Sequence, residues 1–293
     1  MTNFILNVNK ESGMSSHQVV QNIKKITNVK KVGHTGTLDP LASGVLVVCL
    51  GKATKISNFI MNEDKEYIAS FKLGITTDTE DSTGKILESK HVNINKKIIE
   101  EAVQNFTGII EQTPPMYSAL KVNGKKLYEL ARKGIEIERK SRKVKIYEIS
   151  VLNICFIKNE IFIKIKCSKG TYIRTLCADI GKFIGCGAHL TSLVRTKNGK
   201  FCIENSLNIK ELKNNCNTGD FQNCITSIDE ILCNYQKIFL TEIEEIKIKK
   251  GISIELRNLK PNKFYVLYSL KNKLLSLSTV TNEGLYKKII NFF

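Results

Sequence analysis

A glycine-rich segment at residues 33–44 constrains the fold more than any other part of this sequence. It reads Gly-His-Thr-Gly-Thr-Leu-Asp-Pro-Leu-Ala-Ser-Gly, and an apolar run at 45–50 follows it directly. Glycine permits tight turns and close backbone approach, and Pro40 fixes φ just after the carboxylate of Asp39. We therefore predict a held loop that presents Asp39 beside a buried strand, an arrangement suited to a single reactive group. An ordinary Asp-Pro turn leading into a strand would use the same residues.

The balance of charge favours a polyanionic partner. Lys and Arg number 45 and Asp and Glu 28 among 293 residues, so the formal net charge is +17. Such an excess points to nucleic acid first and to an acidic membrane surface second. A genome rich in A and T would also raise the lysine content, so charge alone does not decide. The length allows one large domain or two unequal ones, with ample core.

Several classes of protein are disfavoured by motifs that the sequence lacks. The nine cysteines form no Cys-x-x-Cys pair and the four histidines show no ligand spacing with them, so no metal site is expected. Residues 51–54 lack the spacing of a phosphate-binding loop and no dinucleotide fingerprint occurs, so no cofactor is expected. Residues 1–10 do not resemble a signal peptide, and the longest apolar run, 45–50, is too short to cross a membrane. We expect a cytoplasmic protein with no membrane partner.

The periodicity of apolar residues predicts both helices and strands before residue 200. Strand patterns occur at 45–50, 67–73, 144–157 and 161–167. Helix patterns begin at Ser15, which opens a capping box with Gln18, at Asn95 and near Thr171, which we expect to cap the third helix. The mixture predicts an α+β domain.

A basic excursion separates two of these strands. It opens with Gln-Thr-Pro-Pro-Met-Tyr at 112–117, which cannot be helical, and continues to 143. Its basic residues are Lys121, Lys125, Lys126, Arg132, Lys133, Arg139, Lys140, Arg142 and Lys143.

The chain changes character towards its end. Residues 205–223 are polar and rich in Asn, and we interpret them as a surface helix plus a linker. Short β-type runs then return at 243–248, 252–256, 264–270 and 274–280. They predict a small all-β domain after about residue 240.

An arginine stands in an unusual place in the segment Cys-Ser-Lys-Gly-Thr-Tyr-Ile-Arg at 167–174. Here a strand ends, a glycine turns the chain and a helix begins with Arg174 in its first turn. The helix dipole favours anions at that end, so we expect the guanidinium to meet a carboxylate or a phosphate. A solvated surface arginine is the alternative.

Taken together and in this order, the segments resemble the tRNA pseudouridine synthase B (TruB) family over about residues 4–200. The matching stretches are 10–16, 33–46, 65–67, 112–124, 127–134, 167–175 and 185–195. The resemblance implies a pseudouridine-synthase-like α+β fold, with a mixed, largely antiparallel sheet flanked by helices and a small β-rich PUA-like C-terminal domain. It implies a catalytic domain at 1–235, with 112–143 as an RNA-gripping thumb insertion, and an RNA-binding domain at 240–293.

The resemblance also implies roles for individual residues. Asp39 would be the catalytic carboxylate, and Arg174 its ion-pair partner, which would lower the pKa of Asp39 and keep it ionised. Tyr67 would support catalysis by stacking on the target base. The residues implied in substrate binding are Lys10, His34, Tyr67, Tyr172 and Leu193.

The implied activity is that of an isomerase, an intramolecular transferase that converts the T-loop uridine at position 55 of tRNA to pseudouridine through a flipped-out base. The implied partner is the T arm of tRNA, without a required protein partner, and the protein is expected to be a monomer. Two alternatives remain open. One is a related synthase that acts on another RNA, and the other is a non-catalytic protein that binds RNA or folds tRNA.

Two residues depart from the family pattern. Glu11 stands where the family usually has proline, which places a negative charge beside Lys10. Val194 replaces the first of two adjacent arginines. Each change is expected to weaken an RNA contact without touching Asp39.

Overall fold

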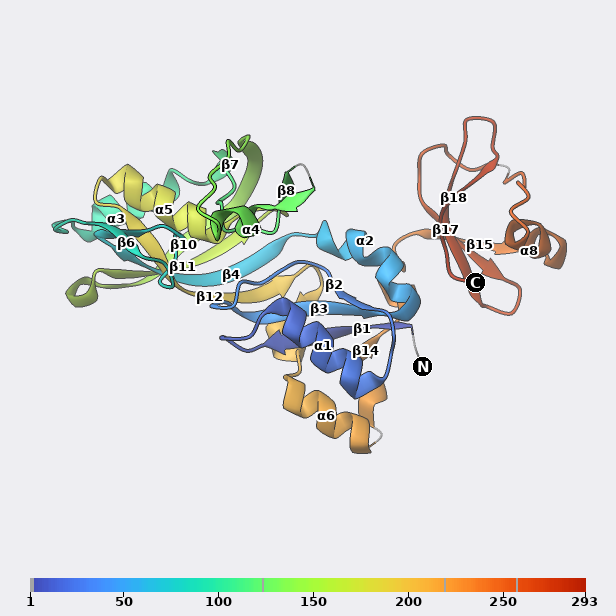
Figure 1. The fold of residues 1–293 in the computed structure, drawn as a ribbon. Coiled ribbons are helices and arrows are strands. Elements are labelled where there is room, and N and C mark those ends of the chain that lie inside the picture. The colour runs from blue at the N-terminus through green and yellow to red at the C-terminus, as the bar shows by residue number, and fades with distance from the viewer. Residues whose placement is uncertain (1–2, 123, 219, 257) are drawn as a thin grey trace.

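A large twisted sheet forms the centre of the molecule (Figure 1). The computed structural model describes residues 3–122, 124–218, 220–256 and 258–293; the remaining five, which the predicted domain ranges include, lie outside the described residues. Along the sheet the strands follow the spatial order β14 (Ile225–Thr226), β1 (Phe4–Lys10), β3 (Ser43–Leu50), β12 (Ala188–Asn198), β4 (Lys65–Leu73), β11 (Glu160–Cys167), β10 (Arg142–Cys155) and β7 (Gly108–Gln112). Two short strands, β2 (Val32–His34) and β13 (Phe201–Cys202), pair with β3 and β12.

The strand pairings of this sheet are antiparallel with one exception among the described residues. Strand β12 runs parallel to β3, where Val194 and Arg195 lie opposite Ser43 and Gly44. On its other side β12 pairs antiparallel with β4. The predicted mixed, largely antiparallel sheet is therefore confirmed, and the parallel step brings the end of the glycine-rich segment beside β12.

Helices flank the sheet, as predicted. They are α1 (Ser16–Thr27), α2 (Ser57–Met61), α3 (Lys96–Gln104), α4 (Leu127–Ala131), α5 (Ile173–Ile184), α6 (Ile209–Thr218), α7 (Ile228–Ile231) and α8 (Glu242–Lys249). Within the described ranges there are also four short 3₁₀ turns, at Gly51–Ile56, Phe156–Lys158, Ile203–Asn205 and Asp220–Cys224. Helix α1 packs against α6, and α5 packs against β12 and α3. The capping box of α1 is present, with Ser15 and Gln18 each bonding the other's backbone N–H.

Strand β3 is buried on both of its faces, which explains why its sequence is continuously apolar. One face joins the main core, to which α1, α3 and α5 contribute. The other face, with Val45, Val47 and Cys49, packs into a second cluster that includes Val266 and Leu277 of the C-terminal region. The strand on which the glycine-rich segment ends is thus held between two layers.

The basic excursion folds as a small arm over the sheet. A hairpin of β8 (Lys121–Val122) and β9 (Lys125–Lys126) leads into α4, and β10 then returns to the sheet. A second small pair, β5 (Ile75–Thr77) with β6 (Ile86–Ser89), lies beyond the end of β4. Figure 1 shows both additions at the half of the molecule away from the C-terminal region.

The C-terminal region forms its own sheet of β15 (Gln236–Leu240), β16 (Tyr265–Ser269), β17 (Leu274–Val280) and β18 (Tyr286–Asn291). A small β-rich C-terminal domain is thus confirmed. Strand β15 lies across the interval between the predicted ranges 1–235 and 240–293, so those boundaries stay predictions.

Two of the predicted strands in this tail are wrong. Residues 243–248 lie in α8, because Thr241 accepts from the N–H of Glu244 in a capping box, and acidic and basic residues match the helix dipole at its two ends. Residues 252–256 make one isolated bridge, at Glu255, although Ile254 and Leu256 are buried. The interpretation of 205–223 as helix plus linker holds for α6 only, since a 3₁₀ turn at Asp220–Cys224 follows and packs against that helix.

The predicted cap of α5 is also wrong. The Thr171 hydroxyl donates to the carbonyl of Ser168 at 2.9 Å, back across the turn at Gly170, where φ is +81°. Tyr172 is the N-cap residue and its side chain makes no capping bond. Arg174 still lies in the first turn, as predicted.

Candidate functional site

The loop that carries Asp39 is held by the segment between β1 and α1. The hydroxyl of Ser16 accepts from the N–H of Leu38 at 2.9 Å, and the N–H of Gly13 donates to the carbonyl of Pro40 at 2.8 Å. Within the loop, the N–H of Ala42 donates to the carbonyl of Asp39 at 3.1 Å. The backbone around Asp39 is thus fixed from two sides, as the glycine-rich segment predicts.

Gly44 shows why the loop requires a glycine where it enters β3. Its φ is +97°, and a Cβ at this position would lie 2.3 Å from the carbonyl oxygen of Arg195. No side chain fits this approach. The glycine lets β3 and β12 meet in parallel and keeps the Asp39 loop next to β12.

Arg174 pairs with Asp39 at the start of α5. The distance from Arg174 Nε to Asp39 Oδ2 is 2.9 Å. The guanidinium side chain is only 5% exposed, whereas that of Asp39 is 37% exposed. The arginine therefore lies behind the carboxylate, which remains open to a ligand.

The rest of the guanidinium is bound by groups that the sequence analysis did not identify. Arg174 Nη1 lies 3.6 Å from Asp81 Oδ2 and donates to the carbonyl of Thr79 at 2.9 Å, while Nη2 donates to the carbonyl of Tyr117 at 2.8 Å. Asp81 is buried, and its other oxygen accepts from Thr79 and Thr83. These contacts orient the guanidinium, so its position is defined by three separate segments of the chain.

The turn that presents the Thr79 carbonyl is tied to the helix of Arg174. Glu80 has a φ of +62°, and its Oε2 accepts from the hydroxyl of Thr175 at 2.6 Å. A left-handed conformation is uncommon for glutamate and persists where the surroundings hold it. The turn and α5 thus form one unit around the guanidinium.

The electrostatics at Asp39 correct one expectation. Removal from water raises the pKa of Asp39 above its ordinary value, and the attraction of Arg174 only partly opposes this effect. Repulsion from the carboxylate of Asp81 also raises the pKa. Arg174 thus lowers the pKa of Asp39, as predicted, but desolvation outweighs the ion pair, and the pKa is raised overall.

A cavity of about 330 Å³ opens in front of Asp39. Its walls come from the glycine-rich loop, from β4 and β12, from the start of α5 and from the basic excursion at 112–143. The lining residues are Thr35–Asp39, Met61, Lys65, Tyr67, Ser118–Leu120, Arg142, Ser168, Gly170–Arg174, Leu193 and Arg195. The basic excursion is thus part of the cavity wall.

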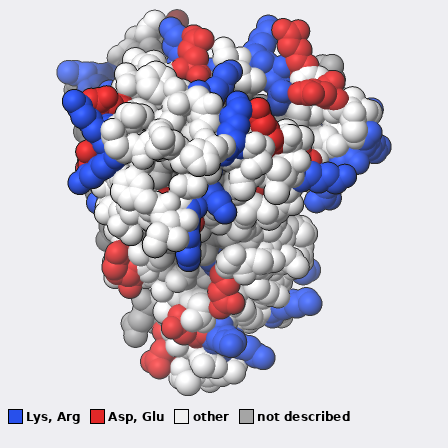
Figure 2. Space-filling view, turned by 90° about the vertical axis from the view of Figure 1, so that its left-hand side faces the viewer, with Lys and Arg blue, Asp and Glu red and all other residues white. Residues whose placement is uncertain are grey.

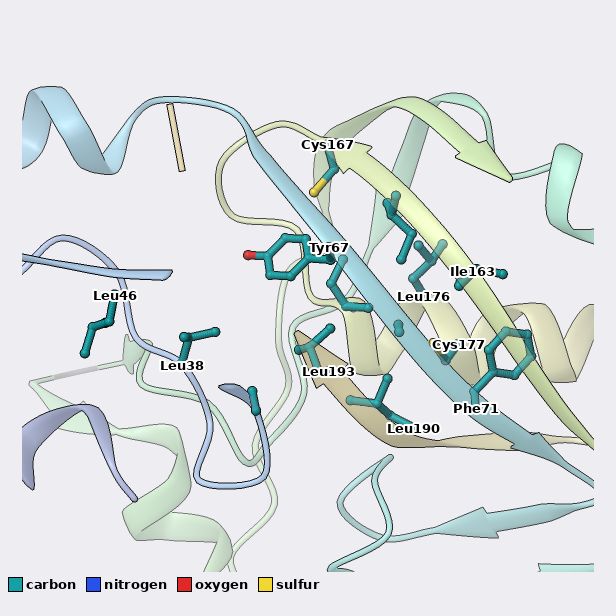
Figure 3. Close-up of a cluster of buried hydrophobic side chains, with 14 of the residues drawn as sticks. Leu38, Leu46, Tyr67, Phe71, Ile163, Cys167, Leu176, Cys177, Leu190 and Leu193 are labelled. Carbon is teal, nitrogen blue, oxygen red and sulfur yellow. The ribbon is translucent and has the colours of Figure 1, made fainter. Parts of the chain in front are cut away.

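The cavity brings together five of the predicted site residues, namely Asp39, Tyr67, Tyr172, Arg174 and Leu193. Tyr67 is buried, and Figure 3 shows its ring extending from β4 towards the side where Leu38 and Leu46 lie, with Leu193 on the neighbouring strand. The guanidinium of Arg142 lies 4.9 Å from the centre of the Tyr172 ring. The carboxylate thus shares a small cavity with two aromatic rings.

Two predicted binding residues, Lys10 and His34, are not among the residues that line this cavity. Lys10 is fully buried, and its ammonium donates to the carbonyls of Glu11, Met14 and Pro40. Burial lowers its pKa to about 8. His34 accepts from the N–H of Gly36 at 3.3 Å through Nδ1, and burial lowers its pKa too. Lys10 thus binds the loop that carries Asp39, through the carbonyl of Pro40.

The two residues that depart from the family pattern both lie outside the cavity. Glu11 is exposed, and Lys10 bonds its carbonyl rather than its carboxylate. Val194 is partly buried in β12, opposite Ser43 and Ile68. Neither residue lines the cavity.

The described part of the chain contains no group of three or more His, Cys, Asp or Glu side chains that could hold a metal ion. None of the helices within the described ranges is both long and apolar enough to span a membrane. On the end of the molecule seen in Figure 2, basic side chains are interspersed with acidic ones. The cationic character is therefore not gathered into one patch on that end.

Solved structures share the fold of this chain over nearly its whole length. It resembles a chain in "Crystal Structure of a Cbf5-Nop10-Gar1 Complex", with a TM-score of 0.71 at 26% identity, over 99% of this chain and 84% of that one. The structure titled "Structure of H/ACA RNP bound to a substrate RNA containing 2'-deoxyuridine" has the same fold, with a TM-score of 0.72 at 24% identity, over 99% and 85% of the two chains.

The sequence comparisons define the family. The model for the TruB family pseudouridylate synthase (N terminal domain) matches residues 24–173, and that for the tRNA pseudouridylate synthase B C-terminal domain matches 174–233. Proteins named tRNA pseudouridine synthase B are 49% identical in Clostridium novyi, covering 97% of both chains, and 47% identical in Clostridium acetobutylicum, covering 96% of both. The chain belongs to the TruB family of pseudouridylate synthases.

Proposed function

We propose that this protein converts the T-loop uridine at position 55 of tRNA to pseudouridine, with Asp39 as the catalytic carboxylate. The observation that carries the proposal is the pairing of Asp39 with a buried arginine at 2.9 Å, on the wall of a cavity of about 330 Å³, in a TruB-family chain. The relatives at 43–49% identity over nearly their full length are named for tRNA, which favours tRNA over other RNA substrates.

The reaction is an isomerisation and consumes no second substrate. The N1–C1′ bond of uridine breaks, the base turns, and a C5–C1′ bond forms, after which C5 loses a proton and N1 gains one. Ionised Asp39 either attacks C1′ or removes the proton at C2′. Both routes need the carboxylate close to the ribose, and its 37% exposure beside the cavity supports such an approach.

The target base must leave its stack to reach Asp39, which costs a few kcal/mol (order of magnitude). We propose that the ring of Tyr67 stacks on the base and that Tyr172 and Leu193 complete its pocket. Lys10 would act as a positioning residue through the loop carbonyl of Pro40. His34 would meet the RNA outside the cavity.

We propose 1–235 as the catalytic domain, with 112–143 as a thumb that grips the RNA, and 240–293 as a PUA-like RNA-binding domain. In its support, Ser118–Leu120 of the thumb line the cavity, and Tyr117 binds Arg174. We also propose that the protein acts as a cytoplasmic monomer without a protein partner.

The proposed activity is tested by tritium release from RNA labelled at C5 of uridine. An isolated T-arm stem-loop and a full-length tRNA transcript should both release tritium at position 55. A transcript with cytidine at position 55 serves as the control. Release from the control equal to that from the uridine transcript would overturn the proposal.

Two substitutions at Tyr67 are expected to distinguish the contribution of the ring to activity from that of the hydroxyl. Tyr67→Leu should lower kcat/KM for the T-arm by about 5- to 100-fold, because stacking of a base on an aromatic ring is worth about 1–3 kcal/mol. Tyr67→Phe keeps the ring and should stay within about threefold of the wild type. Single-turnover kinetics measure both variants, and equal losses in the two would contradict a stacking role.

The rate should depend on pH through Asp39. Because burial raises the pKa of Asp39, its protonated, inactive form persists to a higher pH than for an ordinary aspartate. The single-turnover rate is therefore expected to rise with pH through a pKa above the ordinary 3.8 and then to level. Single-turnover rates measured across the stable pH range test this, and an acid limb at or below 3.8 would contradict it.

A further inference from the structure

A second and larger cavity lies between the catalytic domain and the C-terminal sheet. We call it the interdomain cleft, and its volume is about 730 Å³, more than twice that of the cavity before Asp39. It is walled by α2 and the following turn, by the ends of β12 and β13, by α7 and by the chain before β16. Figure 1 shows α2 lying between the large sheet and the C-terminal sheet. This volume lies within the range of about 300–1,000 Å³ that is usual for ligand sites.

Three aromatic rings converge in the interdomain cleft, each from a different segment. The ring centres of Phe59 and Phe264 are 5.6 Å apart, those of Tyr235 and Phe264 5.7 Å, and those of Phe59 and Tyr235 6.3 Å. All three pairs are edge-to-face, so in each pair the edge of one ring lies against a face of the other. Phe264 remains 39% exposed. Such a cluster offers a stacking surface to a planar ligand.

The polar groups of the cleft suit a base better than a phosphate. Three carboxyl groups line it, those of Glu63, Asp64 and Glu230, against one ammonium, that of Lys200. Carboxylates repel phosphate but accept hydrogen bonds from amino groups on bases. Asn58 and Asn234 add amides, which can donate or accept. Asn198 is fully buried, and within the described residues its Oδ1 has no hydrogen-bond partner.

The cleft and the cavity before Asp39 share a wall. Met61 and Lys65 line the cavity, whereas the intervening residues 62–64 line the cleft. Lys169, next to the Gly170 turn at the cavity, donates to Asn62 Oδ1 at 2.9 Å. An RNA held at Asp39 therefore passes beside the cleft.

We propose that the interdomain cleft binds an unpaired nucleobase of the substrate RNA that lies outside the T arm and carries an exocyclic amino group. Adenine, cytosine and guanine meet this description and uracil does not. The ring of Phe264 stacks on the base, and Glu63 accepts from its amino group. This inference rests on the proposed function and adds a second point of contact to it.

The test compares two RNAs with three variants. Phe264→Ala should weaken binding of a full-length tRNA transcript by about 5- to 100-fold and leave binding of the isolated T-arm stem-loop unchanged. Glu63→Gln, which preserves shape, should weaken transcript binding several-fold. Phe239→Ala is the matched control, since Phe239 is a 51% exposed aromatic residue of β15 outside the cleft. It should leave both affinities unchanged.

Competition by short oligonucleotides identifies the base. Hexamers of cytidine or adenosine should displace the transcript from the wild type more strongly than from Phe264→Ala, and a uridine hexamer should not show this difference. Equal effects on transcript and T-arm, or none in Phe264→Ala and Glu63→Gln, would overturn the inference. Tritium release from the T-arm by the wild type is read in parallel, so failure of the cleft and failure of the proposed function are distinguishable.

Discussion

Replacement of Asp39 by asparagine is expected to abolish tritium release from tRNA, by a factor of at least about 10³, while tRNA still binds. Asparagine has almost the same shape, but it neither attacks C1′ nor accepts the C2′ proton. Affinity should be unchanged or slightly higher, because a negative charge beside the RNA backbone is removed. Single-turnover release and filter binding measure the two quantities on the same protein.

The melting temperature of Asp39→Asn shows whether a loss of activity comes from a loss of folded protein. Because the pKa of Asp39 is raised in the folded protein, ionisation of this carboxylate lowers the stability of the fold as the pH rises above the ordinary pKa of aspartate. Asp39→Asn should therefore melt at the same temperature as the wild type or higher. Asp179→Asn, a carboxyl of α5 outside the cavity, is the matched control and should keep its activity. Retained turnover in Asp39→Asn would remove Asp39 from the mechanism.

Arg174→Lys is expected to lower the rate of the chemical step by about 10²- to 10³-fold, although the charge is conserved. The guanidinium holds Asp39 and the carbonyls of Thr79 and Tyr117 at 2.8–2.9 Å at the same time. A single ammonium nitrogen cannot reach all three, so the carboxylate loses its orientation. KM for tRNA should change by less than about threefold, because the arginine is 5% exposed and lies behind Asp39.

The matched control is Arg132→Lys, the same substitution at an exposed arginine of the thumb that lies over the ring of Tyr128. It should leave the single-turnover rate unchanged and affect KM at most. If Arg174→Lys instead raises KM and leaves the rate intact, the residue binds RNA and does not position Asp39.

The local patterns of the sequence predicted much of the fold because they act over short distances. The apolar run of β3, the alternation in β4 and the capping box at Ser15 each specify an element without reference to the rest of the chain. The alternation at 243–248 failed because a capping box at Thr241 starts a helix over the same residues. Helix signals at a terminus outweighed a weak strand pattern there.

Only those site residues that lie in a distinctive sequence motif could be predicted from the sequence. Asp39 and Arg174 stand in distinctive motifs, and they lie together as expected. Asp81 lies in a short polar turn rich in Thr, which reads as an ordinary loop, and the Tyr117 carbonyl has no sequence signal. The raised pKa of Asp39 follows from burial by distant segments, which no local pattern reports. The buried position of Lys10 is of the same kind, since charge alone favours an exposed RNA contact.

The most direct measurement maps pseudouridine along an unmodified tRNA transcript after incubation with the wild type and with Asp39→Asn. We expect one pseudouridine, at the T-loop position 55, with the wild type and none with the variant. Pseudouridine at other positions alone, or at position 55 with both proteins, would contradict the assignment of this cavity and its carboxylate to the T-loop uridine.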